Sequence, residues 1–216
     1  MSETPRVTVC IFAKPPVAGT VKTRLAGAEQ AARLARAFLL DTCAAVRALP
    51  WAEPILATTG SLGADLERQL ELPIWPQGDG DLGARIERVL TRALESAPGA
   101  IALGADTPGL PSELLDRAHA ALTLADAAIG PTDDGGFYLL ALRHCPEGLL
   151  SNLPWSDPDT FTATLARLHE RGLQTVILDR WFDIDRPADL ERLHALLTAR
   201  VLIAPETLHT LLSVTS

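Results

Sequence analysis

Apolar positions along the chain alternate between short continuous runs and longer segments with helical spacing. The first run covers residues 7–12, and from about residue 28 to 49 apolar side chains recur every three or four positions until Pro50. The same alternation then predicts strands at 54–58, 72–75 and 100–104 and helices at 62–70, 81–97 and 112–124. Strands that alternate with helices of this length predict βαβ units, a mostly parallel sheet and ligand binding at the carboxyl ends of the strands.

The alternation changes after residue 125. Two apolar runs, at 127–130 and 136–142, are separated only by residues 131–135, which predicts a hairpin or a crossover without a helix. The remaining pattern predicts a helix at 159–171, a strand at 173–178, a helix at 187–199 and an apolar tail at 201–216. The tail has two candidate positions, the edge of the sheet or a second subunit in a homodimer. Because the sequence has no internal repeat or linker, we expect a single α/β domain over residues 1–216.

Composition and charge exclude several classes of protein. The 216 residues are 47% hydrophobic and 21% charged, which argues against wholesale disorder. The formal net charge is -8, so we expect no binding to nucleic acid or to an anionic membrane, both of which need a broad basic surface. Cys10, Cys43 and Cys145 form neither a disulfide pattern nor a zinc motif. With no signal peptide or long apolar stretch, we expect a cytoplasmic protein.

The positive charge is distributed unusually, because the chain has only two lysines and both lie in one loop. Lys14, Lys22 and Arg24, together with Gly19, follow the first predicted strand, where an α/β fold places its ligand. This loop therefore predicts a phosphate-binding site. It is not a Walker A motif, since Val21 stands where that motif has glycine. The alternative is three solvated surface cations.

Three segments together resemble a known family. They are Phe12–Pro16 with Lys22–Leu25, then Gly104–Pro108, and Asp133–Phe137. The chain resembles the bacterial radical-SAM/selenodomain-associated transferase family over roughly residues 7–190. The resemblance implies a three-layer αβα fold of the GT-A type, as in nucleotide-diphospho-sugar transferases, and a glycosyltransferase-like activity. The loop is also similar to that of 2-phospholactate guanylyltransferases, in which basic residues bind a nucleoside triphosphate.

Residues 78–83 match the pattern G-x-G-x-x-G, which is also the dinucleotide fingerprint. We reject a Rossmann dehydrogenase, because the match follows the third predicted strand and carries two carboxylates where a pyrophosphate would approach. The resemblance instead implies a nucleotide-binding role for Gln77, Asp81, Gly83 and Arg85. For Asp81, the alternative is a helix N-cap.

The resemblance implies a metal site at the carboxyl edge of the sheet. It assigns Asp106 to the metal-binding aspartate of GT-A folds, although Gly104 stands where the full motif has a second acid. Asp185, and with less support Asp183, would complete a Mg²⁺ or Mn²⁺ site, since these ions take a few carboxylate oxygens together with phosphates and water. The alternative for Asp185 is a cap on the helix that begins near Pro187.

The acceptor site is expected where the parallel pattern breaks. The resemblance points to residues of two segments, namely Asp134, Gly135, Gly136, Phe137, Trp155 and Ser156. Asp134 would orient or deprotonate an acceptor hydroxyl. The alternatives are a plain turn at 133–136 and a core or interface tryptophan.

We therefore expect a Mg²⁺- or Mn²⁺-dependent transferase that uses a nucleotide-activated donor and a small acceptor, with Lys22, Asp106 and Asp134 as catalytic residues. Of the possible reactions, glycosyl transfer from a nucleotide sugar is the preferred interpretation. A nucleotidyltransferase, which would join a nucleoside triphosphate to a small phosphorylated or sugar-like substrate and release pyrophosphate, is the alternative. A catalytically degenerate nucleotide-binding module is a third interpretation, favoured by Gly104.

Overall fold

The structure is a computed structural model that describes residues 6–214. Its strands form one seven-stranded sheet in the order β3-β2-β1-β4-β6-β5-β7. The strands are β1 Val7–Ala13, β2 Ala52–Thr58, β3 Ile74–Pro76, β4 Ala100–Gly104, β5 Ala127–Pro131, β6 Phe137–Leu142 and β7 Thr175–Ile177. The helices are α1 Ala28–Arg47, α2 Ala64–Leu70, α3 Leu82–Leu94, α4 Ser112–Ala121, α5 Thr160–Glu170, α6 Pro187–Thr198 and α7 Pro205–Val214.

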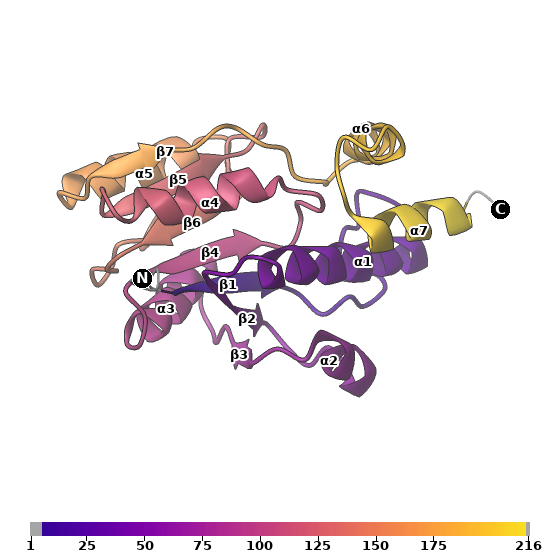
Figure 1. Cartoon of the computed structure of the whole chain (residues 1–216), viewed down its shortest axis with the longest axis horizontal. Coiled ribbons are helices and arrows are strands. Elements are labelled where there is room, and N and C mark those ends of the chain that lie inside the picture. Colours follow the sequence, from indigo (N-terminus) through magenta and orange to yellow (C-terminus); the bar gives the residue numbers. More distant parts are fainter. Residues whose placement is uncertain (1–5, 215–216) are drawn as a thin grey trace.

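Helices cover both faces of the sheet, which confirms the predicted three-layer αβα arrangement (Figure 1). On one face, side chains of α1, α2 and α4 pack on the strands around Leu39, Leu66 and Leu115. On the other face, α3 and α5 pack around Leu90 and Leu168. Strands β1 and β4 are almost wholly buried, which explains why they read as continuous apolar runs with no alternation.

The sheet is mixed at the point where the sequence pattern changes. β6 lies between β4 and β5 and is antiparallel to both, while the other pairings are parallel. Of the two connections that the sequence left open between β5 and β6, the structure has the hairpin. Because of this reversal, the turn at 132–136 leaves β5 at the same edge of the sheet as the carboxyl ends of β1 and β4.

The carboxyl-terminal apolar segment forms α7, which the sequence pattern did not predict. It packs along α1, next to α6 (Figure 1). Asp41 in α1 holds its first turn: the Asp41 carboxylate accepts hydrogen bonds from the backbone N–H groups of Glu206 (3.0 Å) and Thr207 (2.8 Å) and from the Thr207 hydroxyl (2.6 Å). Within one chain the segment therefore lies on α1, whereas the sheet edges are β3 and β7. The homodimer stays a prediction.

A third apolar cluster joins the carboxyl-terminal helices to the elements that carry the charged loops. Leu25, at the end of the first loop, lies in this cluster with Phe38 of α1 and Leu193 of α6. The cluster also includes Ile184, in the segment before α6. This cluster fixes the first loop and the segment before α6 on a common support.

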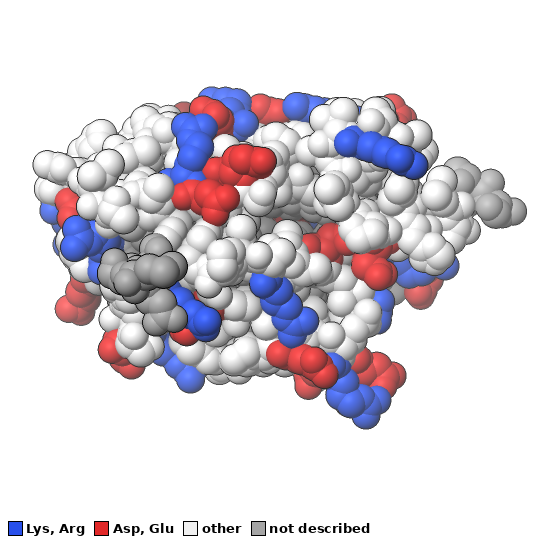
Figure 2. All heavy atoms as spheres, in the orientation of Figure 1, with Lys and Arg blue, Asp and Glu red and all other residues white. Residues whose placement is uncertain are grey.

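Two features of the surface bear on the expected partners. On the face in Figure 2, Lys and Arg side chains lie scattered among Asp and Glu side chains. Among residues 6–214, no helix has both the length and the hydropathy needed to cross a bilayer.

Candidate functional site

Charged side chains gather at the edge of the sheet where β1, β4 and β5 end. The first loop follows β1, Asp106 follows β4, and the 132–136 turn follows β5. A fourth segment, residues 179–185, leads from β7 toward α6. This edge is where the sequence predicts a ligand site.

Lys22 is the centre of this arrangement. Its Nζ atom lies 2.6 Å from Oδ1 of Asp185 and 3.1 Å from Oδ2 of Asp106. The lysine side chain is only 7% exposed, whereas more than half of each carboxylate side chain is exposed. Burial alone would lower the pKa of Lys22, but the charges of Asp106 and Asp185 reverse that effect, so the pKa is raised and the ammonium stays protonated at neutral pH.

Backbone hydrogen bonds hold the segment before α6 against the other two loops. The N–H of Ile184 donates to the carbonyl of Asp106 (3.1 Å), and the N–H of Trp181 donates to the carbonyl of Pro131 (3.0 Å). Ile184 itself is buried in the cluster that includes Leu25. These contacts place Asp183 and Asp185, on either side of Ile184, between Asp106 and the 132–136 turn.

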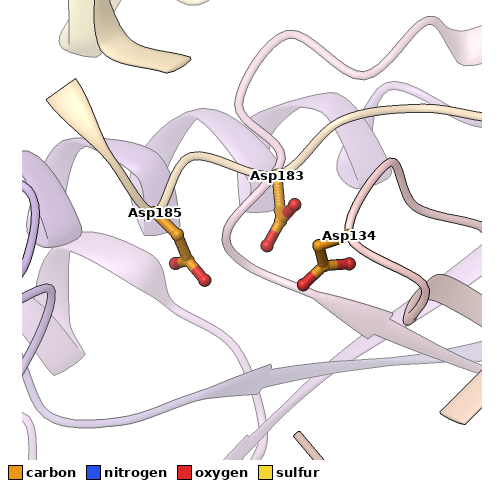
Figure 3. Close-up of side chains that lie close together, drawn as sticks. All are labelled: Asp134, Asp183 and Asp185. Carbon is orange, nitrogen blue, oxygen red and sulfur yellow. The ribbon is translucent and has the colours of Figure 1, made fainter. Parts of the chain in front are cut away.

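The carboxylates of Asp134, Asp183 and Asp185 converge (Figure 3). One oxygen from each lies within 4.8 Å of the others. Burial, with the nearby charges of Asp134 and Asp185, raises the pKa of Asp183 to about 7. The pKa of Asp185 is lowered: burial opposes the lowering, and the charge and hydrogen bond of Lys22 outweigh burial. The crowding therefore favours the uptake of a proton or a cation at this position.

Two hydrogen bonds orient Asp134 toward its partners. Its Oδ1 atom accepts from the Thr132 hydroxyl (2.6 Å) and from the backbone N–H of Gly136 (3.0 Å). Thr132 is buried, whereas Asp134 is exposed. One carboxylate oxygen is thus fixed by the turn, and the exposed side chain can be reached by a ligand.

The donor chemistry suits a divalent cation. The converging atoms are all carboxylate oxygens from separate segments, which is what Mg²⁺ and Mn²⁺ prefer, and the exposed side leaves room for ligands from a substrate. Asp106 is linked to this trio through Lys22, whose ammonium group pairs with both Asp106 and Asp185. The N-cap residue of α6 is Arg186 and not Asp185, whose carboxylate instead accepts a hydrogen bond from Lys22.

The residues assigned to the nucleotide side have visible structural roles. The buried Gln77 amide donates to the carbonyls of Ala13 (3.2 Å) and Ala57 (2.9 Å), which ties the ends of β1, β2 and β3 together. Asp81 is the N-cap of α3 and accepts from the N–H of Ala84 (2.8 Å), and Arg85 Nε donates to the Asp81 carbonyl (3.2 Å). Their binding roles stay predictions.

An open cavity of about 350 Å³ lies beside these residues, at the carboxyl ends of β2 and β3. Its lining includes hydroxyl, carboxylate and backbone groups of Thr58, Thr59, Gly60, Ser61, Glu67 and Asp79. Gly60 also lies against Pro15 of the first loop, since a Cβ atom there would be 3.4 Å from Pro15 Cγ. The cavity therefore adjoins the loop that carries Lys14 and Lys22.

The residues assigned to the acceptor lie close together. Phe137 and Trp155 meet edge to face, with ring centroids 6.0 Å apart. Gly135, at φ +91, packs so closely on the segment after Trp155 that a Cβ atom would lie 2.0 Å from the carbonyl oxygen of Pro158. Gly83 also packs closely on Trp155, since a Cβ atom there would lie 2.8 Å from Cζ2 of the indole. The structure thus places the turn with Asp134 and Gly136 beside the segment of Trp155 and Ser156.

A family model matches residues 41–157, just over half of the chain. It describes an uncharacterized protein conserved in bacteria, DUF2064. The chain belongs to the DUF2064 family. A comparison of the sequence with curated proteins gives no significant match.

Several solved structures have the same fold as this DUF2064 protein. A protein from Desulfovibrio desulfuricans G20, provisionally described as a nucleotide-diphospho-sugar transferase, is 29% identical, with a TM-score of 0.79 over 87% of this chain and 86% of that one. A CMP:2-keto-3-deoxy-manno-octonic acid synthetase complexed with CTP is 14% identical, with a TM-score of 0.62 over 90% and 99%. The 4-diphosphocytidyl-2C-methyl-D-erythritol synthase from Anaerococcus prevotii DSM 20548 is 13% identical, with a TM-score of 0.61 over 91% and 100%.

These likenesses confirm the fold of nucleotide-diphospho-sugar transferases for the DUF2064 chain. The closer resemblance to selenodomain-associated transferases and to 2-phospholactate guanylyltransferases stays a prediction.

Sequence reasoning missed three contributors to the site of this DUF2064 protein. Thr132 orients Asp134, and Arg88 donates to the carbonyls of Gln77 (2.6 Å) and Asp79 (3.0 Å), which shapes the loop before α3. Glu67 lines the cavity from α2. Thr132 carried a usable signal, as a hydroxyl residue two positions before Asp134; Arg88 and Glu67 read as ordinary surface charges on helices.

Proposed function

We propose that the protein is a divalent-metal-dependent transferase that uses a nucleotide-activated donor and transfers its glycosyl group to a hydroxyl of a small acceptor. The observation that carries the proposal is a charged cluster at the carboxyl edge of the sheet, in which Lys22 pairs with Asp106 and Asp185, and Asp185 converges with Asp134 and Asp183. An open cavity lies beside the loop that carries Lys22. The fold, and the 29% identity to a protein provisionally described as a nucleotide-diphospho-sugar transferase, support it.

In the proposed complex the donor phosphates lie over the first loop and the nucleoside enters the cavity at β2 and β3. Lys14, Lys22 and Arg24 neutralise the charge that develops on the leaving nucleoside diphosphate. Asp106, Asp183 and Asp185 would hold Mg²⁺ or Mn²⁺, which supplies further positive charge at the phosphates. Positioning and charge stabilisation then lower the barrier.

Asp134 is the proposed base. Its carboxylate accepts the proton of the acceptor hydroxyl while the hydroxyl oxygen forms a bond to the anomeric carbon of the donor. The bond between the anomeric carbon and the phosphate oxygen breaks at the same time, and its electron pair stays on the nucleoside diphosphate. Phe137 and Trp155 form a wall for the acceptor. The hydrogen bonds from Thr132 and Gly136 keep Asp134 oriented for this role.

The acidic character of the acceptor side favours glycosyl transfer to a neutral hydroxyl. A phosphorylated acceptor would meet Asp134 and Asp183, and the nearby Arg180 and Arg192 are engaged by the Thr132 carbonyl and by the Asp133 carboxylate. The nucleotidyl alternative draws support from the three cations of the first loop, because a triphosphate needs more positive charge than a diphosphate. Its acceptor would be a sugar-like hydroxyl.

Product analysis separates the two reactions. The protein is incubated with Mn²⁺ and hydroxyl acceptors, first with UDP-, GDP-, ADP- and dTDP-sugars and then with the four ribonucleoside triphosphates. Glycosyl transfer predicts release of a nucleoside diphosphate from a nucleotide sugar, and EDTA abolishes this release. Pyrophosphate from a triphosphate would instead establish the nucleotidyl alternative, and binding of nucleotides without any turnover would point to the degenerate module.

A further inference from the structure

We infer that Lys22 makes the carboxylate site selective, so that it rejects a free divalent cation and accepts the cation only together with a polyphosphate. The inference rests on the proposed function, since it assumes that a metal–nucleotide complex is the ligand. It assigns Lys22 a role in the order of binding, in addition to its contact with phosphates.

The ammonium group of Lys22 lies between two carboxylates of the site. Nζ lies 2.6 Å from one Asp185 oxygen and 3.1 Å from one Asp106 oxygen, so both carboxylates already have a cationic partner. A divalent cation that took oxygens from this pair would sit within a few ångströms of the ammonium. The ammonium and the cation would repel each other, and burial of the Lys22 side chain limits the screening of this repulsion by water.

Lys22 is far more buried than the carboxylates that it contacts. Its side chain is 7% exposed, whereas the side chains of Asp106 and Asp185 are 58% and 52% exposed. The lysine therefore approaches from the protein side and leaves the solvent side of both carboxylates open. A ligand can therefore reach the carboxylates from solvent without passing the lysine. The buried lysine side chain, in contrast, cannot move out into water when the ligand arrives.

The first loop holds Lys22 in an unusual backbone conformation. The residue has φ +47, in the left-handed region that residues other than glycine seldom adopt. Val21 and Leu25 on either side are buried, and the N–H of Leu25 donates to the Lys22 carbonyl (2.9 Å). The packing of its neighbours holds this backbone conformation and with it the position of the ammonium.

A polyphosphate changes this balance because it brings its own anionic oxygens. The ammonium can then exchange a carboxylate for a phosphate oxygen, which removes the repulsion and frees carboxylate oxygens for the cation. Cation and polyphosphate should therefore bind with positive coupling that runs through Lys22.

Calorimetric titration with Mn²⁺ tests the inference, with and without inorganic pyrophosphate. In the wild type we expect weak binding of Mn²⁺ alone and binding about tenfold tighter with pyrophosphate, a usual size for such coupling. Lys22→Met should bind Mn²⁺ alone about tenfold more tightly than the wild type and lose most of the gain from pyrophosphate. Lys22→Arg, which keeps the charge, should resemble the wild type.

Lys14→Met is the matched control, because it removes the other lysine of the same loop, an exposed one. Its affinity for Mn²⁺ alone should stay within about twofold of the wild type, since a screened surface charge contributes little. Circular dichroism confirms that each variant is folded. The shift in melting temperature on addition of Mn²⁺ reports binding independently of the calorimetric heat signal.

The outcomes separate the inference from the proposed function. If Lys22→Met binds Mn²⁺ no more tightly than the wild type, or if the wild type binds Mn²⁺ equally well without pyrophosphate, the inference is wrong and the proposed function stands. If no variant binds Mn²⁺ under either condition, the metal dependence in the proposed function fails as well.

Discussion

The Nζ atom of Lys22 lies 2.6 Å from Oδ1 of Asp185, although 163 positions separate the two residues in the sequence. The contact joins the first loop of the chain to the segment before α6, and the backbone bond from Ile184 to Asp106 adds the loop after β4. Three loops that are distant in sequence therefore form one charged site.

The carboxylate of Asp134 is predicted to be the base. Asp134→Asn should lower the transferase kcat by about 100- to 10,000-fold, the usual contribution of a positioned base, with little change in nucleotide affinity. The matched control is Asp133→Asn, which removes the adjacent carboxylate that pairs with Arg192 at 3.0 Å. Steady-state kinetics check both, and an equal loss of kcat in the two variants would argue against a specific role for Asp134.

Gly83 is predicted to be intolerant of any side chain. A Cβ atom there would lie 2.2 Å from the carbonyl oxygen of Leu150 and 2.8 Å from Cζ2 of Trp155, so Gly83→Ala must displace the backbone or the indole. We expect a loss of about 1–3 kcal/mol in the free energy of unfolding and a change in tryptophan fluorescence.

Gly27→Ala is the control for this change. A Cβ atom at Gly27 meets nothing within 4 Å, and its φ of -57 suits any residue. Its stability should match the wild type in the same denaturant titration. A Gly83→Ala protein as stable as Gly27→Ala, with unchanged fluorescence, would contradict the packing described for Trp155.

Asp41 is predicted to anchor α7 on α1. Asp41→Ala removes the acceptor for two backbone N–H groups and the Thr207 hydroxyl, so we expect a loss of about 1–2 kcal/mol in unfolding free energy, as for other helix caps. Thr207→Val removes only the hydroxyl and should cost less. Compared with the wild type, Asp41→Ala should show faster amide hydrogen exchange in α7 but not in β1 and β4. An equal change in all three elements would argue against a local anchor.

The same carboxylate predicts a dependence of stability on pH. Burial raises the pKa of Asp41, and the hydrogen bonds from Thr207 and Glu206 only partly oppose this. Because the folded-state pKa exceeds the ordinary 3.8, the folded protein binds the proton more tightly, and this contribution to stability is lost as pH rises from 3.8 through the folded-state pKa. The unfolding free energy of the wild type relative to Asp41→Asn should therefore fall over that range. A difference that rises with pH would contradict the direction of the shift.

The sequence was sufficient for most of the fold, because the strands are either continuous apolar runs or lie next to clear turn signals. β4 has the predicted bounds of 100–104, and α1 ends at Arg47, close to the expected limit near Pro50. The helix at 205–214 was not predicted, although Pro205 at its first position and Glu206 in its first turn are usual start signals. The side chain that accepts its first N–H groups is Asp41, far away in the sequence, and Ala204 before the helix offers no cap. Such tertiary capping leaves no signal in the helix itself.

The candidate site was predictable in its parts but not in its assembly. Asp106, Asp134 and Asp185 could each be placed at the edge of the sheet from strand order and from resemblance. The central position of Asp183 could not be foreseen, because it follows from the backbone bonds of Trp181 and Ile184 to segments far away in the sequence. For the same reason, no local pattern revealed that Lys22 bridges two carboxylates.

The central claim is that this site binds a nucleotide-activated donor together with a divalent cation. Calorimetric titration of the wild type with nucleotide sugars and nucleoside triphosphates, each with Mn²⁺ and again with EDTA, tests it most directly. We expect that at least one nucleotide binds in the presence of Mn²⁺ and that EDTA or Asp106→Ala removes this binding. If none of these nucleotides binds under either condition, the claim is contradicted.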